Sequence, residues 1–150
     1  MDYYNGYVAW YIEHAHRALE DLPEQDATWR SIAAIVLGNA HGFRGNMAAA
    51  YEARSQAAEA YTSGGNTYFS ILAQLEVAIT LREQGQLQRT IEICRQQVQL
   101  AQQSGLSQVA MAGCLLAIWG EALAEQGDLE GAKRQTKEGV KRAEGGDLAM

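Results

Sequence analysis

The sequence predicts an all-α protein in which about seven antiparallel helices, three full pairs preceded by one leading helix, form a right-handed α-α superhelix. Three observations predict this fold class. A glycine-containing pattern recurs about every forty residues, a period typical of helical repeat proteins. Between its breaks, the apolar residues follow helical spacing and never a sustained alternation. The connections are so short that consecutive helices must be antiparallel neighbours.

The repeat also predicts how the chain is divided. Copies of the pattern begin at Gly6, Gly45, Gly85 and Gly127. Each unit closes at a second break, which lies at Pro23, at Gly64 and Gly65, at Gly105, and at Gly145 and Gly146. Because one helix pair cannot bury its apolar face alone, adjacent pairs must stack. We therefore expect a single domain over residues 1–150, with a leading half-repeat (1–25) and three repeats (26–65, 66–105 and 106–147).

Cap residues and glycines set the expected helix bounds. A glycine just past a helix can adopt the left-handed conformation that ends it, and Asn46 or Asp128 can cap the helix that follows. Gln86 is a weaker cap, and Asn66 and Ser107 are candidate caps of the other helices. The expected helices are 7–22, 28–44, 47–63, 67–84, 87–104, 107–126 and 129–144.

Small and large residues alternate as close helix packing requires. Tyr51, Tyr61 and Trp119 are large enough to fill the gaps between helices. Small residues at the expected contacts allow helices to approach closely; they are Gly38, Ala57, Ala78, Gly120, Ala132 and Gly139. This pattern is structural and implies no chemistry.

Composition excludes several classes of protein. Among 150 residues, 12 are Lys or Arg and 18 are Asp or Glu, which gives a net charge of −6 and argues against direct binding of nucleic acid by this chain. The apolar run Val109–Gly120 is too short to cross a membrane, and no basic segment precedes an apolar one at the start, so we expect no signal peptide. Two cysteines form no disulfide framework, which favours a cytoplasmic protein.

The segment Leu116–Ala132, which contains Trp119-Gly120 and then Gly127-Asp128-Leu129 at the turn, resembles a tetratricopeptide repeat. The middle pair departs from the pattern, with Ala78, Gln86 and Thr90 at positions where the family has Gly, Asp and Ala. Three further segments resemble the sensor region of MalT-type, LuxR-family ATP-dependent transcriptional regulators: Arg17–Pro23, Leu37–Gly45, and Lys137–Val140 leading to Gly146-Asp147. The similarity covers nearly the whole chain.

This resemblance implies a non-enzymatic module that receives a signal by binding a protein or an effector and so shifts an oligomerisation equilibrium. In such regulators an ATPase domain precedes the repeats and a helix-turn-helix DNA reader follows them. The chain has no Gly-x4-Gly-Lys-Ser/Thr phosphate loop. The alternative is a free-standing peptide-binding scaffold or adaptor that is not linked to transcription.

No residue pattern indicates catalysis, a metal or a cofactor, so we expect none of them. His14 and His16 are two residues apart on a helix and point to different sides, which makes them poor joint metal ligands. His41 has no partner in the sequence for a catalytic role, and structural roles are favoured. Cys94 and Cys114 are expected on neighbouring helices, more readily as buried small residues than as a redox pair.

Two surfaces are candidates for binding. The first helix of each pair is expected to line a concave groove that binds a protein, a peptide or a small effector. Its expected lining is Ile35, Asn39, Phe43, Leu75, Ile79, Arg82 and Glu121. The second candidate is a self-association edge on the leading helix, where aromatic residues without a partner helix could join two copies into a homodimer. It consists of Tyr3, Tyr4, Tyr7, Trp10 and Tyr11.

Overall fold

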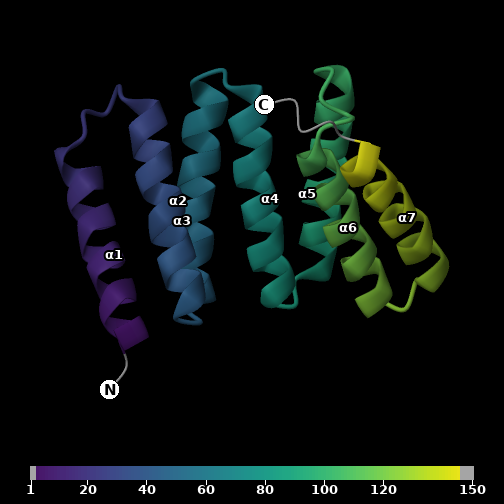
Figure 1. Cartoon of the computed structure of the whole chain (residues 1–150), viewed down its shortest axis with the longest axis horizontal. Helices are drawn as coiled ribbons and strands as arrows, with labels where there is room; N and C mark the ends of the chain where they lie inside the picture. Colours follow the sequence, from purple (N-terminus) through teal and green to yellow (C-terminus); the bar gives the residue numbers. More distant parts are fainter. Residues whose placement is uncertain (1–2, 146–150) are drawn as a thin grey trace. The chain divides into compact units, whose positions relative to one another are not determined.

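The computed structural model describes residues 3–145, and side chains from Gly6 to Glu144. Over this range the chain forms seven helices and no strand, which confirms the predicted all-α class (Figure 1). The helices are α1 (Tyr3–Asp21), α2 (Ala27–Phe43), α3 (Met47–Ser63), α4 (Thr67–Glu83), α5 (Leu87–Gln103), α6 (Ala110–Glu125) and α7 (Leu129–Gly145).

The described residues form two compact units. The first ends at Ala73 and contains α1, α2, α3 and the beginning of α4, while the second begins at Gln74 and contains the rest. In the first unit α2 packs against both α1 and α3, and in the second α6 packs against both α5 and α7. Within each unit, consecutive helices run in opposite directions (Figure 1). Each unit is therefore built from antiparallel helix neighbours, as the short connections predict.

One kind of joint connects most of the helices. At the end of α2, Gly45 has a φ of 75°. The backbone N–H groups of Asn46 and Gly45 donate to the carbonyls of His41 and Gly42, both at 2.9 Å, which is the hydrogen-bond pattern of a Schellman motif. The Asn46 side chain then accepts from the N–H of Ala49 at 3.2 Å and caps α3. The joint thus ends one helix and begins the next within three residues.

The same backbone pattern recurs at four later joints, which explains the glycine period. The left-handed glycines there are Gly65, Gly85, Gly105 and Gly127, with φ between 72° and 86°. Asn66 and Asp128 cap their helices through side-chain oxygens, as predicted. Gln86 makes no such bond to the α5 backbone. The backbone of this joint therefore does not depend on the side-chain cap.

Two predicted helix starts are wrong. The first helix begins at Tyr3, well before residue 7, because Gly6 lies inside α1 and ends no helix. The sixth begins at Ala110, because the Val109 N–H donates to the Leu106 carbonyl (3.3 Å) and the chain forms a turn there. Ser107 therefore does not cap α6. The expected bounds of the other helices agree with the structure to within one residue.

The core of the first unit joins its helices through small residues and one large ring. Tyr61 is only 3% exposed and packs in a cluster with Ala34, Ala57, Ala58 and Ala73. A second cluster joins α1 to α2 and α3; it consists of Ala15, Leu37 and Ala53. Arg30 of α2 also donates to the carbonyls of Leu19 and Leu22, both at 2.7 Å, and so satisfies the end of α1.

In the second unit the closest approach is between α6 and α7. A Cβ atom at Gly113 would lie 2.7 Å from the carbonyl oxygen of Gly139, and one at Gly120 would lie 3.0 Å from that of Ala132. Gly120, Ala132 and Gly139 thus serve the close packing predicted for them, and Gly113 joins them. Cys94 of α5 is fully buried, and burial raises the pKa of its thiol to about 12. Cys114 is exposed, so its expected burial is wrong.

Candidate functional site

Large apolar side chains gather on the exposed side of α1 and α2. On α2, Phe43 is 74% exposed and Trp29 is 60% exposed; on α1, Tyr7 is 65% exposed. Trp10, Tyr11, Ile32 and Val36 are also exposed. Single exposed apolar residues are ordinary, but contiguous ones on neighbouring helices mark an interaction surface. The exposed apolar surface of α1 and α2 is therefore a candidate binding site.

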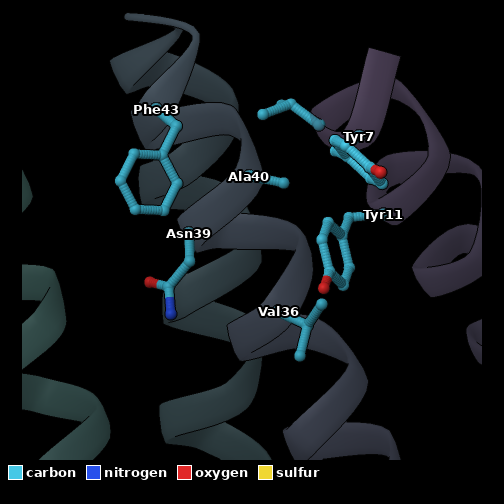
Figure 2. Close-up of a pocket in the computed structure, with 7 residues that line it drawn as sticks. Tyr7, Tyr11, Val36, Asn39, Ala40 and Phe43 are labelled. Atoms are coloured by element: carbon cyan, nitrogen blue, oxygen red, sulfur yellow. The ribbon is translucent and has the colours of Figure 1, made fainter. Parts of the chain in front are cut away.

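A cavity of about 400 Å³ lies between the start of α1 and the end of α2. We call it the tyrosine cavity; its lining is Tyr7, Val8, Tyr11, Val36, Asn39, Ala40 and Phe43. Figure 2 shows Tyr7 and Tyr11 reaching from α1 towards α2, with the Tyr11 ring beside Val36. The lining is apolar except for the Asn39 amide and the tyrosine hydroxyls. Such a site suits an apolar group that carries a polar atom.

A second cavity, of about 480 Å³, lies between the end of α1 and the start of α2. We call it the tryptophan cavity; its lining is Tyr11, His14, Ala15, Ala18, Asp21, Leu22, Trp29, Ile32, Ala33 and Val36. Because Tyr11 and Val36 line both cavities, the two lie next to each other. We call the whole the aromatic groove.

Helical spacing explains how the groove arises. On α2, Trp29, Ile32, Val36 and Phe43 are spaced three, four and seven residues apart, so they share one face. The core side of the same helix carries residues such as Leu37, which is 6% exposed. Helix α2 is thus apolar on two sides and needs a covering on each. Among the described residues, the core side of α2 is covered, whereas the side that carries Trp29 and Phe43 is left largely exposed.

Two contacts order the side chains around the groove. The Trp10 and His14 rings stack with centroids 3.9 Å apart, and the His14 Nδ1 lies 2.8 Å from the Trp10 carbonyl oxygen. The Asn39 Oδ1 accepts a hydrogen bond at 2.7 Å from the guanidinium of Arg54, which is only 8% exposed. A buried charged donor of this kind fixes the orientation of the amide. The Asn39 amide in the lining of the tyrosine cavity is therefore pre-positioned.

The residues predicted for the concave groove lie in both units, and each unit is described by itself. In the first, Asn39 and Phe43 line the tyrosine cavity, while Ile35 is half-buried against the Tyr61 cluster. In the second, Leu75 is buried, Ile79 is half-buried, and Arg82 of α4 forms an ion pair with Glu121 of α6. The single groove expected across all the pairs stays a prediction.

The predicted self-association edge overlaps the aromatic groove. Tyr7 and Tyr11 line the tyrosine cavity, and Trp10 packs edge-to-face on Tyr11 with ring centroids 5.3 Å apart. The side chains of Tyr3 and Tyr4 lie outside the described part of the structure. On the α2 side, the sequence predicted only Asn39 and Phe43 as binding residues, and assigned them to the concave groove. The signal for the α2 side was a second apolar stripe, beginning at Trp29, opposite the core stripe.

A histidine pair spans α1 and α2. The His16 and His41 rings lie 6.3 Å apart between centroids, a proximity that the sequence analysis did not anticipate. Burial lowers the pKa of the His41 imidazole from its ordinary value of 6.5, and the nearby charges of His16 and Arg44 lower it further. The fold therefore favours the neutral form of His41.

We expect the chain to lose stability as the pH falls below about 6.5 because of this histidine. A folded-state pKa below that of the unfolded chain means that the unfolded chain takes up the proton first. The stabilising contribution is thus present above the unfolded pKa and is lost as the pH falls through the folded one. Melting temperatures measured between pH 5 and 8 should fall less in His41→Gln than in the wild type. Parallel curves for the two proteins would contradict this.

The residues that the structure describes offer no grouping for metal chemistry, since no three His, Cys, Asp or Glu side chains come together as ligands could. Nor is any helix in this range long and apolar enough to cross a membrane. A family model described as the MalT-like TPR (tetratricopeptide repeat) region matches residues 2–149. The chain belongs to this family. No curated protein matches it.

The MalT-like TPR assignment confirms the resemblance drawn from the sequence and agrees with the helical pairs of each unit. Tetratricopeptide repeats generally mediate protein interactions, because stacked helix pairs present extended surfaces to a partner. In this MalT-like TPR region, the aromatic groove is the apolar depression that the exposed rings of α1 and α2 enclose. It is the candidate functional site of the chain.

Proposed function

We propose that this chain is the signal-sensing and oligomerisation part of a transcriptional regulator. It acts without catalysis, in the cytoplasm, by binding a protein, a peptide or a small effector. The observation that carries the proposal is the aromatic groove in a chain of the MalT-like TPR family. The groove combines exposed rings with a pre-positioned amide at Asn39, which suits selective binding of a mostly apolar partner.

Binding at this groove transmits a signal only if the partner distinguishes two states of the regulator. A partner that covers the rings on α1 competes with any second copy of the chain that uses the predicted self-association edge. Occupancy of the groove would thus shift the balance between monomer and homodimer. The residues predicted to line the concave groove, including Arg82 and Glu121, form a second proposed surface for binding a partner.

The test replaces exposed groove residues in the organism that encodes the chain. Trp29→Ser and Phe43→Ser remove rings that are mostly exposed, so they should leave the melting temperature nearly unchanged. The matched control is Leu129→Ser, which removes a side chain of α7 that is 68% exposed and lies outside the groove. Transcript levels are compared with those of a strain that lacks the gene.

We expect both groove variants to reproduce the transcript changes of the deletion strain and the control to leave transcripts at the wild-type level. If the deletion changes transcripts and the groove variants do not, the groove is not the sensing site. If the deletion changes no transcript, the regulatory role fails. The alternative of a free-standing scaffold or adaptor is then favoured if a specific bound peptide is lost on Arg82→Glu.

A further inference from the structure

We infer that the aromatic groove is the seat of one amphipathic α-helix of the same kind as the chain's own α2, supplied by a partner. This rests on the proposed function, since it names the class of partner that the groove binds. The first unit contains two successive places where a helix can pack between two others. One of them holds a helix, and the other is open and has residues of the same size and polarity at the corresponding positions.

The filled place lies between α3 and α4. Here α2 presents Ala34, which is 3% exposed, to a cluster that contains Ala57 and Tyr61 of α3 and Ala73 of α4. Phe69 of α4 stacks on the Tyr61 ring with centroids 5.2 Å apart. Helix α2 thus packs through a small residue against two alanines, which are flanked by the rings of Tyr61 and Phe69.

The open place lies one repeat earlier, between α1 and α2. Four residues that line the tryptophan cavity precede the four seat residues by one repeat length, about forty residues. Small residues correspond to small ones and large apolar ones to large apolar ones. In order, Ala18, Leu22, Trp29 and Ala33 correspond to Ala57, Tyr61, Phe69 and Ala73. The tryptophan cavity therefore has the same kinds of residues as the site between α3 and α4, where α2 packs.

The size of the groove agrees with this occupant. From Trp29 to Phe43 the apolar stripe of α2 extends about 21 Å at 1.5 Å per residue. The helices α2, α3, α4, α5 and α7 have 17 residues each, so one more helix of that length would cover the stripe. Amphipathic helices bind to exposed apolar grooves of this kind through their apolar face.

A second folded copy cannot supply the contact face of α2. In the folded chain Ala34 is already buried against α3 and α4, so its face is unavailable to another molecule. The occupant must therefore be a helix whose small-residue face is free before binding. A partner segment that folds as it binds, or a helix exposed in the partner, meets this condition.

The test uses the full chain and a synthetic peptide with the sequence of residues 26–46, labelled with fluorescein and extended by lysines for solubility. Fluorescence anisotropy measures its binding. The control peptide carries Ala34→Glu, which places a charge against the two alanines of the seat. The control chains are Ala18→Glu, which alters the seat from α1, and Leu129→Ser, which lies outside it.

A second measurement locates the peptide. In a chain with Ile32→Cys and Cys114→Ser, iodoacetamide labels the introduced thiol of the tryptophan cavity, while the buried Cys94 is protected. Mass spectrometry then follows the labelling rate with and without the peptide. This readout does not depend on whether Ala18→Glu keeps its fold.

We expect the peptide to bind the wild type and Leu129→Ser with equal affinity, and to bind Ala18→Glu at least tenfold more weakly. In the labelling experiment, the peptide should slow the reaction of the thiol at Ile32→Cys at least fivefold. The Ala34→Glu peptide should bind at least tenfold more weakly. The inference that the groove binds a helix would be overturned if both peptides bound equally or if neither bound. It would also be overturned if the peptide accelerated labelling, since that would mean that it displaces α2. Those results would leave the transcript experiment to decide the proposed function on its own.

Discussion

Replacing Gly113 with valine is expected to destabilise the chain by about 3 kcal/mol, the upper part of the range for overpacked cores. A Cβ atom at this position would lie 2.7 Å from the carbonyl oxygen of Gly139 and 3.0 Å from the backbone nitrogen of Ala143. Both atoms belong to the backbone of α7, so no side-chain rotation can relieve the contact. Helices α6 and α7 must therefore move apart.

The measurement is urea unfolding followed by circular dichroism, together with amide hydrogen exchange in α6 and α7. The matched control is Gly6→Val, since Gly6 also lies inside a helix but nothing lies within 4 Å of its added Cβ atom. The control should stay within about 0.5 kcal/mol of the wild type, because valine and glycine differ little in helix propensity. If both variants lose the same stability, the close approach of the two glycines is not what holds this pair together.

The helical joints could be predicted from the sequence because they are local. A left-handed glycine followed by a capping residue acts over a few residues, and Gly45-Asn46 carries both signals in order. Glycine does not mark a helix end where it serves another structural role. Gly6 lies within a helix, and Gly113 has a φ in the ordinary helical range and serves the contact with α7.

The candidate site could be predicted only in part because it depends on tertiary contacts. The aromatic residues of α1 were visible as a cluster, but Trp29, Ile32 and Val36 could equally have been core residues of α2 by spacing alone. Only the packing of Ala34 and Leu37 against other helices shows which apolar stripe is buried. The same limit explains the correction at Cys114, which was expected to be a buried small residue although its side chain is exposed.

Replacing Tyr61 with alanine is expected to have the largest effect, about 3 to 5 kcal/mol, as for other buried aromatic residues truncated to alanine. Tyr61 is the one large side chain among the buried residues of its cluster, and the four alanines beside it are too small to fill the space it leaves. The cluster also holds α2 against α3 and α4. We therefore expect amide exchange to accelerate first in α2 and α3, measured at a urea concentration well below the midpoint.

The control Tyr61→Phe separates ring volume from the hydroxyl group. Burial raises the pKa of the Tyr61 phenol from 10.0, so the hydroxyl stays protonated at neutral pH and its loss should cost at most about 1 kcal/mol. If Tyr61→Phe were as unstable as Tyr61→Ala, a polar contact rather than packing would hold the cluster. A similar loss on Phe69→Ala, whose ring is 40% exposed, would also contradict the packing argument, because an exposed ring has less buried surface to lose. The stability of the first unit thus depends on the seat in which α2 rests, the same arrangement that the aromatic groove offers to a partner helix.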